Sequence, residues 1–232
     1  MKRFWTEATV APFGTGWQVL LDGRAVKTQT GSVQVVPSQP LAAAMAAEWA
    51  AQGATVDPAS LPLRDLADYA IDVIAPGRTA ATAHLLRYAE TDTLCYRAEP
   101  DEALHARQLA LWEPLLTAAE QRWDIHFERV SGVIHRPQSP ATLARLERVL
   151  SAHDDFTLAA LTTLSALAAS LTIALAALEE ESADSGRLWN AANLEEDWQI
   201  ELWGADAEAA ERRALRLGAF RAAQRFAELV RT

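Results

Sequence analysis

The sequence predicts an α+β protein: a small N-terminal domain, mainly antiparallel β with one helix, followed by a larger all-α helical bundle domain. Two contrasts in residue usage support this prediction. The first forty residues are rich in Val, Thr, Trp and Phe and are divided by glycines, which is typical of short strands. Most of the remaining chain is rich in Ala and Leu, with apolar residues three or four positions apart, which is typical of helices. We place the two domains at residues 1–60 and 61–232.

The N-terminal strands are expected to form an antiparallel meander. They are predicted within residues 3–13, 16–23, 24–29 and 32–38. Asp22-Gly23 falls between the second and the third and indicates a tight hairpin turn, because glycine tolerates the positive φ that such a turn requires.

One helix is predicted to close the N-terminal domain, over residues 38–53. The hydroxyl of Ser38 can cap its first turn, Pro40 suits that turn, and Gly53 can end the helix. Two prolines within residues 57–63 then mark the boundary between the domains.

The second domain is predicted to be helical almost throughout. Its helices are expected within residues 63–75, 78–97, 100–123, 139–153, 156–178, 183–204 and 205–230. Breaks are expected at Pro76-Gly77, within residues 132–140 and at Gly204. The turn at His153-Asp154-Asp155 is interpreted as the start of a helix.

Residues 156–178 are uncharged and long enough to span a bilayer. Their leucines, however, form a single stripe, and Ala, Thr and Ser fill most other positions. Flanking aromatic and basic anchors are also lacking. We therefore predict a helix buried in a soluble bundle, with a break near Ser170, and no stable membrane insertion.

Charge and cysteine content narrow the class of protein. The formal net charge is −10 and the chain has no run of Lys or Arg, so nucleic-acid binding is not expected. The lone Cys95 cannot form an internal disulfide and is expected to be a buried thiol in a reducing compartment. The N-terminus resembles neither a signal peptide nor a transit peptide, which predicts a cytoplasmic protein.

The sequence lacks the motifs of common enzyme and cofactor classes. It contains no phosphate-binding loop, no GxSxG and no GxGxxG. Its five histidines are never four residues apart and never in an HExxH arrangement. We therefore expect no catalytic residues, no cofactor and no metal ion.

Residues 193–204, NLEEDWQIELWG, combine four carboxylates with two tryptophans. On a helix, Glu195, Trp198, Gln199 and Leu202 would share one face, and Leu194 and Trp198, with Ile200 or Leu202, would anchor it in the core. Three interpretations stay open. The segment is a solvated acidic face, an acid/base pair formed by Glu195 and Glu196, or a recognition edge for a basic, partly apolar protein surface.

Six segments, in order along nearly the whole chain, carry a resemblance to a known family. They are RFW at 3–5, LDGRAVKT at 21–28, VPSQPLAAAMAAEWAAQ at 36–52, ETDTLCYRAE at 90–99, QLALWEPLL at 108–116 and LEEDWQIELWG at 194–204. In residues and in spacing they are similar to the assembly chaperones of the ATP synthase α subunit, which occur in mitochondria and α-proteobacteria. That family has a small N-terminal α+β domain followed by a helical domain.

The resemblance implies a non-enzymatic molecular chaperone for assembly of the F-type ATP synthase head. Such a protein binds unassembled α subunit and prevents its aggregation until the β subunit displaces it. The resemblance places a functionally sensitive acid at Glu195 or Glu196, in a partner-binding segment with Trp198, Gln199 and Trp203. The alternative from the residues alone is a soluble helical hydrolase of unknown substrate that uses paired carboxylates.

Two departures from the family pattern are visible. Gln29 stands where many relatives have a proline, and the N-terminal extension of mitochondrial members is lacking. The second departure predicts a bacterial cytoplasmic member, whereas mitochondrial relatives act in the matrix. We expect the protein to be monomeric when free of its partner.

Overall fold

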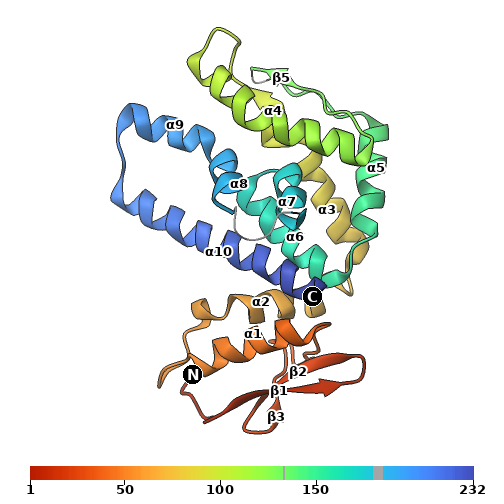
Figure 1. Cartoon of the computed structure of the whole chain (residues 1–232), viewed down its shortest axis with the longest axis vertical. Helices are drawn as coiled ribbons and strands as arrows, with labels where there is room; N and C mark the ends of the chain where they lie inside the picture. Colours follow the sequence, from red (N-terminus) through yellow and green to blue (C-terminus); the bar gives the residue numbers. More distant parts are fainter. Residues whose placement is uncertain (133, 180–184) are drawn as a thin grey trace. The chain divides into compact units, whose positions relative to one another are not determined.

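A computed structural model describes residues 1–132, 134–179 and 185–232. The chain divides into two compact units, which we call the N-terminal unit and the helical unit. The N-terminal unit contains Met1–Arg78, Asp154–Ala160 and Ala222–Thr232, and the helical unit contains Thr79–His153 and Leu161–Arg221. The predicted fold class is confirmed, because a small antiparallel sheet precedes a mostly helical chain (Figure 1). The predicted domain boundary after residue 60 stays a prediction.

A three-stranded antiparallel sheet forms one layer of the N-terminal unit. Strand β1, Ala8–Phe13, pairs with β2, Gly16–Leu21, and β2 pairs with β3, Arg24–Ala25. The hairpin predicted between β2 and β3 is present, with φ of 47° at Asp22 and 77° at Gly23. Positive φ at both positions matches the twist that a two-residue hairpin needs.

The fourth predicted strand, residues 32–38, is wrong as a continuous element. It makes only isolated bridges to the sheet, between Lys27 and Val33 and between Trp17 and Val36. Between those bridges Gln34 is buried and donates its amide N–H to Asp68 Oδ1 at 2.5 Å. Side-chain contacts therefore replace part of the predicted backbone ladder.

Helix α1, Gln39–Ala50, packs across β1 and β2 (Figure 1). Ser38 caps it as predicted, since Ser38 Oγ accepts the N–H of Leu41 at 3.2 Å. Next come a 3-10 turn η1, Pro58–Ser60, helix α2, Pro62–Tyr69, and a π-helical turn η2, Ala70–Ile74. The Glu48 carboxylate of α1 accepts the N–H groups of Leu63 and Arg64 at 2.8 and 3.1 Å, so α1 caps the first turn of α2.

The predicted helix over residues 78–97 ends early. Helix α3 spans Arg78–Glu90 and is followed by a 3-10 turn η3, Thr93–Cys95, and a short strand β4, Tyr96–Arg97. Asp92 explains the change: its carboxylate is fully buried and accepts the N–H of Leu94 at 3.1 Å and that of Thr172 at 2.9 Å. Cys95 is buried as predicted, and burial raises the pKa of its thiol.

The next helices follow the sequence pattern closely. Helix α4 spans Ala103–Trp123 and α5 spans Pro140–Ser151, with Ser139 as its N-cap. Between them strand β5, Val130–Ser131, pairs in parallel with β4, which the sequence pattern did not predict.

Residues 156–178 form two buried helices, and the break predicted near Ser170 is confirmed. Helix α6 spans Asp155–Ala168 and α7 spans Leu171–Glu179, with the intervening Ala169 at a φ of 48°. Asp154 accepts the N–H of Thr157 at 2.9 Å, so the predicted helix-initiating turn is also present. Among the described residues, no helix combines the length and apolar character needed to cross a membrane.

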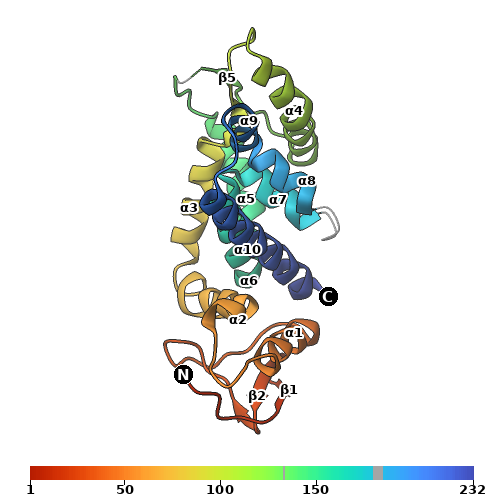
Figure 2. The same ribbon diagram turned by 90° about the vertical axis from the view of Figure 1, so that its left-hand side faces the viewer.

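The predicted helix over residues 183–204 consists of two helices in its described part; residues 183 and 184 lie outside the described ranges. Helix α8 spans Ser185–Ala192 and α9 spans Leu194–Trp203, and the chain then forms α10, Ala207–Arg231. The helical unit has α7 at its centre, between α3 and α8 in both views (Figures 1 and 2). The fully buried Trp112 joins α4 to α8 by donating its indole N–H to Ala191 O at 2.8 Å.

Candidate partner-binding site

Helix α9 carries the acidic segment that the sequence singles out. Glu195, Glu196 and Asp197 occupy its first turn, where the helix dipole favours negative charge. Leu194 is buried and anchors that end of α9, as predicted. At the other end Gly204 has a φ of 91° and donates its N–H to Ile200 O at 2.9 Å, which a residue with a side chain would do under strain.

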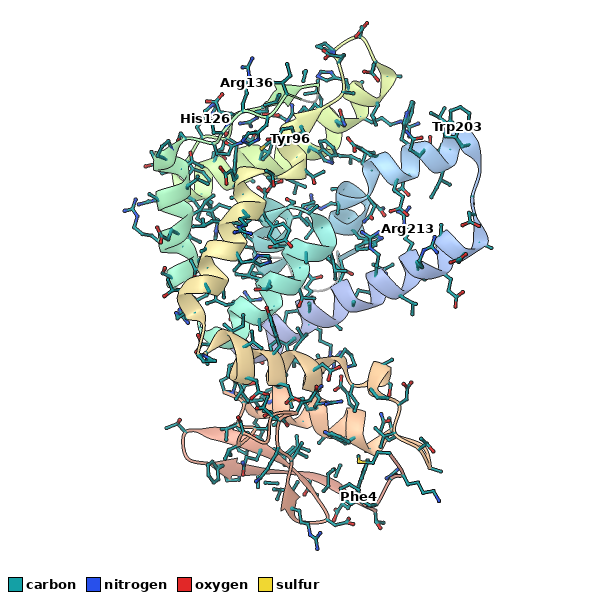
Figure 3. The ribbon with its side chains drawn as sticks, turned by 180° about the vertical axis from the view of Figure 1, so that it is seen from behind. Phe4, Tyr96, His126, Arg136, Trp203 and Arg213 are labelled. Atoms are coloured by element: carbon teal, nitrogen blue, oxygen red, sulfur yellow. The ribbon has the colours of Figure 1, made fainter. Side chains whose placement is uncertain are left out.

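Two of these acids hold α9 to α10. Glu196 lies 3.5 Å from the guanidinium of Arg216, and Asp197 forms an ion pair with Arg213. Arg213 extends from α10 toward α9 (Figure 3), and the hydrogen bond with Asp197 raises its pKa. Both acids are half-buried. Their charges are therefore compensated inside the molecule.

Arg107 of α4 fixes the opposite side of α9. Its guanidinium pairs with Glu201 at 2.8 Å and lies 4.5 Å from the ring centre of Trp198. The hydrogen bond lowers the pKa of Glu201 and raises that of Arg107. Trp198 is half-buried under this cation, so it positions α9 and presents little free ring surface.

Glu195 differs from the other acids of α9. Its Oε1 accepts an N–H from the side-chain amide of Gln108 at 2.8 Å. Gln108 is fully buried, and its amide oxygen accepts the N–H of Ala98 at 2.8 Å. The Glu195 side chain itself is exposed. Within the described ranges no cation pairs with Glu195, so its negative charge is held in place but is not neutralised.

A groove of about 560 Å³ lies beside Glu195 in the helical unit. Its lining comes from β4, the following loop, the start of α4, the end of β5 and one side of α9. The lining residues are Tyr96, Arg97, Ala98, Glu99, Glu102, Leu104, Gly132, Glu195 and Gln199. In the part of the chain that the structure describes, neither Glu99 nor Glu102 has a cationic partner, so three uncompensated carboxylates line the groove.

Among the described residues that line the groove, the one cation is already paired. Arg97 is buried and its guanidinium donates to Glu113 at 2.5 Å, and Arg129 donates to the other oxygen of Glu113 at 2.7 Å. Partial burial raises the pKa of Glu113, but the hydrogen bonds from Arg129 and Arg97 outweigh it and bring the pKa below its usual range. This network stabilises β4 where it lines the groove. Because the Arg97 charge is already compensated, the groove keeps a negative potential.

The far end of α9 presents apolar surface. Trp203 is 82% exposed and Leu202 is 55% exposed, so Leu202 is not one of the core anchors that the sequence allowed. The Trp203 ring projects from the end of the helix (Figure 3). An exposed tryptophan on the helix that also lines the acidic groove has the chemistry of an interface anchor.

The residues predicted for partner binding thus lie in three settings. Glu195 and Gln199 line the groove, Glu196 and Trp198 fasten α9 to neighbouring helices, and Trp203 is exposed at the helix end. The sequence pattern missed Gln108, which orients Glu195, and the groove acids Glu99 and Glu102. Two of these, Gln108 and Glu99, fall within the segments that carry the family resemblance. That position was the only sign in the sequence that they could belong to the site.

Known proteins share this architecture. The structure of Atp12 from Paracoccus denitrificans has a TM-score of 0.92 and 36% identity, covering 99% of this chain and 98% of that chain. An aspartate-to-lysine mutant of the same protein gives the same TM-score of 0.92. The Atu1473 protein of Agrobacterium tumefaciens has a TM-score of 0.93 and 39% identity, covering 98% of this chain and 85% of that chain.

Sequence comparison agrees with the structural similarity. Protein atp12, mitochondrial, of Schizosaccharomyces pombe is 26% identical over 222 residues, which is 90% of this chain and 76% of that protein. The profile of the family described as ATP12 chaperone protein matches residues 2–120. As the resemblance predicted, the chain belongs to the ATP12 chaperone protein family.

Proposed function

We propose that the protein is a chaperone for assembly of the ATP synthase catalytic head. It binds the unassembled α subunit of the F-type enzyme and prevents its aggregation until the β subunit displaces it. Membership of the ATP12 chaperone family supports the chaperone role. The observation that carries the binding site is the groove beside α9, where Glu195 presents a positioned and uncompensated charge.

The chemistry of the groove suits a transient complex. Subunits of obligate assemblies expose large apolar surfaces before they meet their partners, and such surfaces self-associate. A chaperone must cover that surface and then yield to the native partner. A charged groove accelerates encounter with a basic patch without demanding a large buried apolar area, and Trp203 supplies an apolar anchor.

Glu195 is the better candidate for the sensitive acid. Glu196 already pairs with Arg216, so a partner cation would have to compete with an internal one. Glu195 has only the neutral amide of Gln108 as a donor among the described residues, so it retains its full charge for a partner. A lysine at 195 would therefore repel the partner, whereas a lysine at 196 would mainly loosen the contact between α9 and α10.

The geometry gives little support to a hydrolase with paired carboxylates. Acid/base pairs need two carboxyl groups that face one reacting centre. Glu195 bonds to Gln108 of α4, whereas Glu196 pairs with Arg216 of α10, so the two groups are held by different neighbours. We therefore propose a non-enzymatic role. We also propose that the protein acts in the bacterial cytoplasm, as a monomer when free, without binding nucleic acid.

Co-expression with the α subunit tests this proposal. The wild-type chain should increase the soluble fraction of α subunit and co-elute with it on gel filtration. Glu195→Lys should abolish both effects. The matched control is Glu211→Lys, which reverses an exposed acid of α10 outside the groove and should behave like the wild type. An α subunit that aggregates equally with and without the wild-type chain would overturn the proposal.

A further inference from the structure

The N-terminal unit contains a second cavity, of about 360 Å³. Its lining differs in charge from that of the acidic groove. Apolar side chains line part of the cavity, and three cations line another part. These residues include Phe4, Leu21, Trp49, Arg24, Lys27 and Arg64. A volume of this size matches the lower part of the range for ligand pockets, roughly 300–1,000 Å³, and accommodates a large apolar side chain.

Two of the cations at this cavity have no internal counter-charge. Arg24 and Lys27 are exposed, and among the described residues neither has an ion pair or a side-chain hydrogen bond. Arg64, by contrast, contacts Asp65 at 3.2 Å and Asp68 at 3.5 Å. In a chain with a net charge of −10, two cations without partners at the mouth of one cavity favour a negatively charged occupant.

A buried donor at the same cavity is also unsatisfied. Trp49 lines the cavity and is only 6% exposed, yet its indole Nε1–H has no hydrogen-bond acceptor within the described ranges. Leaving a buried donor unpaired costs about 1–3 kcal/mol, so native structures rarely do so without a reason. The indole nitrogen itself has almost no accessible surface, so an oxygen of a bound ligand would satisfy this donor only after the surrounding side chains shift.

The apolar part of the cavity is open to solvent as well. Phe4 is 63% exposed and lies at the edge of the N-terminal unit (Figure 3). Its ring meets that of Trp5 edge to face, with centroids 5.1 Å apart, which fixes its orientation. A bound apolar side chain would cover Phe4, and this would stabilise the complex by burying apolar surface.

We propose that this cavity binds an acidic polypeptide segment that carries one large apolar side chain. The apolar side chain enters beside Phe4 and Trp49, and flanking carboxylates pair with Arg24 and Lys27. This site is opposite in sign to the groove beside α9. The inference does not depend on the identity of the chaperone's client, because it concerns a different surface and is tested with a synthetic peptide.

The test is a titration of the whole ¹⁵N-labelled chain with a capped peptide in which glutamates flank a single phenylalanine. The indole N–H resonance of Trp49, assigned with Trp49→Phe, should shift in a saturable manner. A peptide with lysines in place of the glutamates should bind at least tenfold more weakly. Raising the salt concentration should weaken binding of the acidic peptide.

Matched variants separate a specific site from general charge attraction. Arg24→Glu with Lys27→Glu should reduce affinity for the acidic peptide at least tenfold. Arg221→Glu with Arg225→Glu changes the net charge equally, at exposed positions of α10 that do not line the cavity, and should leave affinity within twofold. Far-ultraviolet circular dichroism should confirm that both variants remain folded.

Several outcomes would overturn the proposal. These are equal binding of both peptides, equal losses in the two double variants, or a Trp49 indole resonance that does not move at saturation. Binding of free glutamate or acetate as tight as that of the peptide would show that the cavity takes small carboxylates. Trp49 shifts that depend on protein concentration without peptide would show that a second copy of the chain occupies the cavity.

Discussion

The buried amide of Gln108 donates an N–H to the exposed carboxylate of Glu195 at 2.8 Å. The same amide accepts the N–H of Ala98 through its oxygen, so it bridges α9 and the chain after β4. This arrangement orients the carboxylate without neutralising it. A partner cation would then meet a charge whose conformational freedom is already restricted, which reduces the entropy lost on binding.

Gln108→Met should therefore affect both stability and binding. The substitution keeps the side chain's length but leaves the Ala98 N–H without its acceptor, which should lower the free energy of unfolding by about 1–3 kcal/mol. It also releases Glu195, so affinity for the α subunit should fall severalfold. Urea unfolding and binding measured on the same preparation check this, and a variant with unchanged values for both would contradict the role given to Gln108.

Trp203→Ser should weaken the complex with little effect on the fold. The ring is 82% exposed, so its removal loses almost no packing in the free protein. If it anchors the interface, affinity should fall about tenfold or more, which corresponds to roughly 1.4 kcal/mol. Thermal unfolding of the free variant should match that of the wild type. A large fall in melting temperature with intact binding would show that Trp203 serves the fold.

Asp92→Ala should destabilise the helical unit strongly. Its carboxylate accepts N–H groups from Leu94 in η3 and from Thr172 in the first turn of α7, and the substitution leaves both donors unpaired in the interior. We expect a loss of roughly 2–4 kcal/mol in urea unfolding. Asp92→Asn keeps one acceptor oxygen and should cost less. Equal losses in the two variants would contradict this account.

Low pH should destabilise the ion-pair network that Glu113 and Glu120 form with the arginines near β4. Partial burial raises the pKa values of Glu113 and Glu120, but hydrogen bonds from Arg129 outweigh it, and both values lie below the usual range. A lowered folded-state pKa contributes stability above the unfolded value, about 4.3, and this contribution is lost as pH falls through the folded value. Urea unfolding at about pH 7 and about pH 3.5 should show the loss, and Arg129→Met should reduce it. An identical pH dependence in the variant would exclude this cause.

Local signals in the sequence were enough for many elements. Ser38 predicted the start of α1, Asp22-Gly23 predicted the hairpin, and Ser170 marked the break between α6 and α7. Each of these signals acts through a side chain or a φ preference within a few residues. The family resemblance also predicted a partner-binding segment in the residues that form α9.

Elements that depend on distant side chains could not be predicted in the same way. The early end of α3 depends on Asp92, which reaches Thr172 eighty positions later. The distinction between Glu195 and Glu196 depends on Gln108 and Arg216, which lie on two other helices. Residue spacing along one helix predicts which face of that helix a side chain occupies. It does not predict which side chain of another helix will pair with it.

The most direct test of the central claim is the affinity of purified α subunit for the wild-type chain, Glu195→Lys, Glu196→Lys and Glu211→Lys, measured by isothermal titration calorimetry. We predict that Glu195→Lys weakens binding at least a hundredfold without changing the free protein's unfolding. We also expect a smaller effect of Glu196→Lys, no effect of Glu211→Lys, and release of the wild-type chain by added β subunit. Wild-type affinity in Glu195→Lys would contradict the central claim.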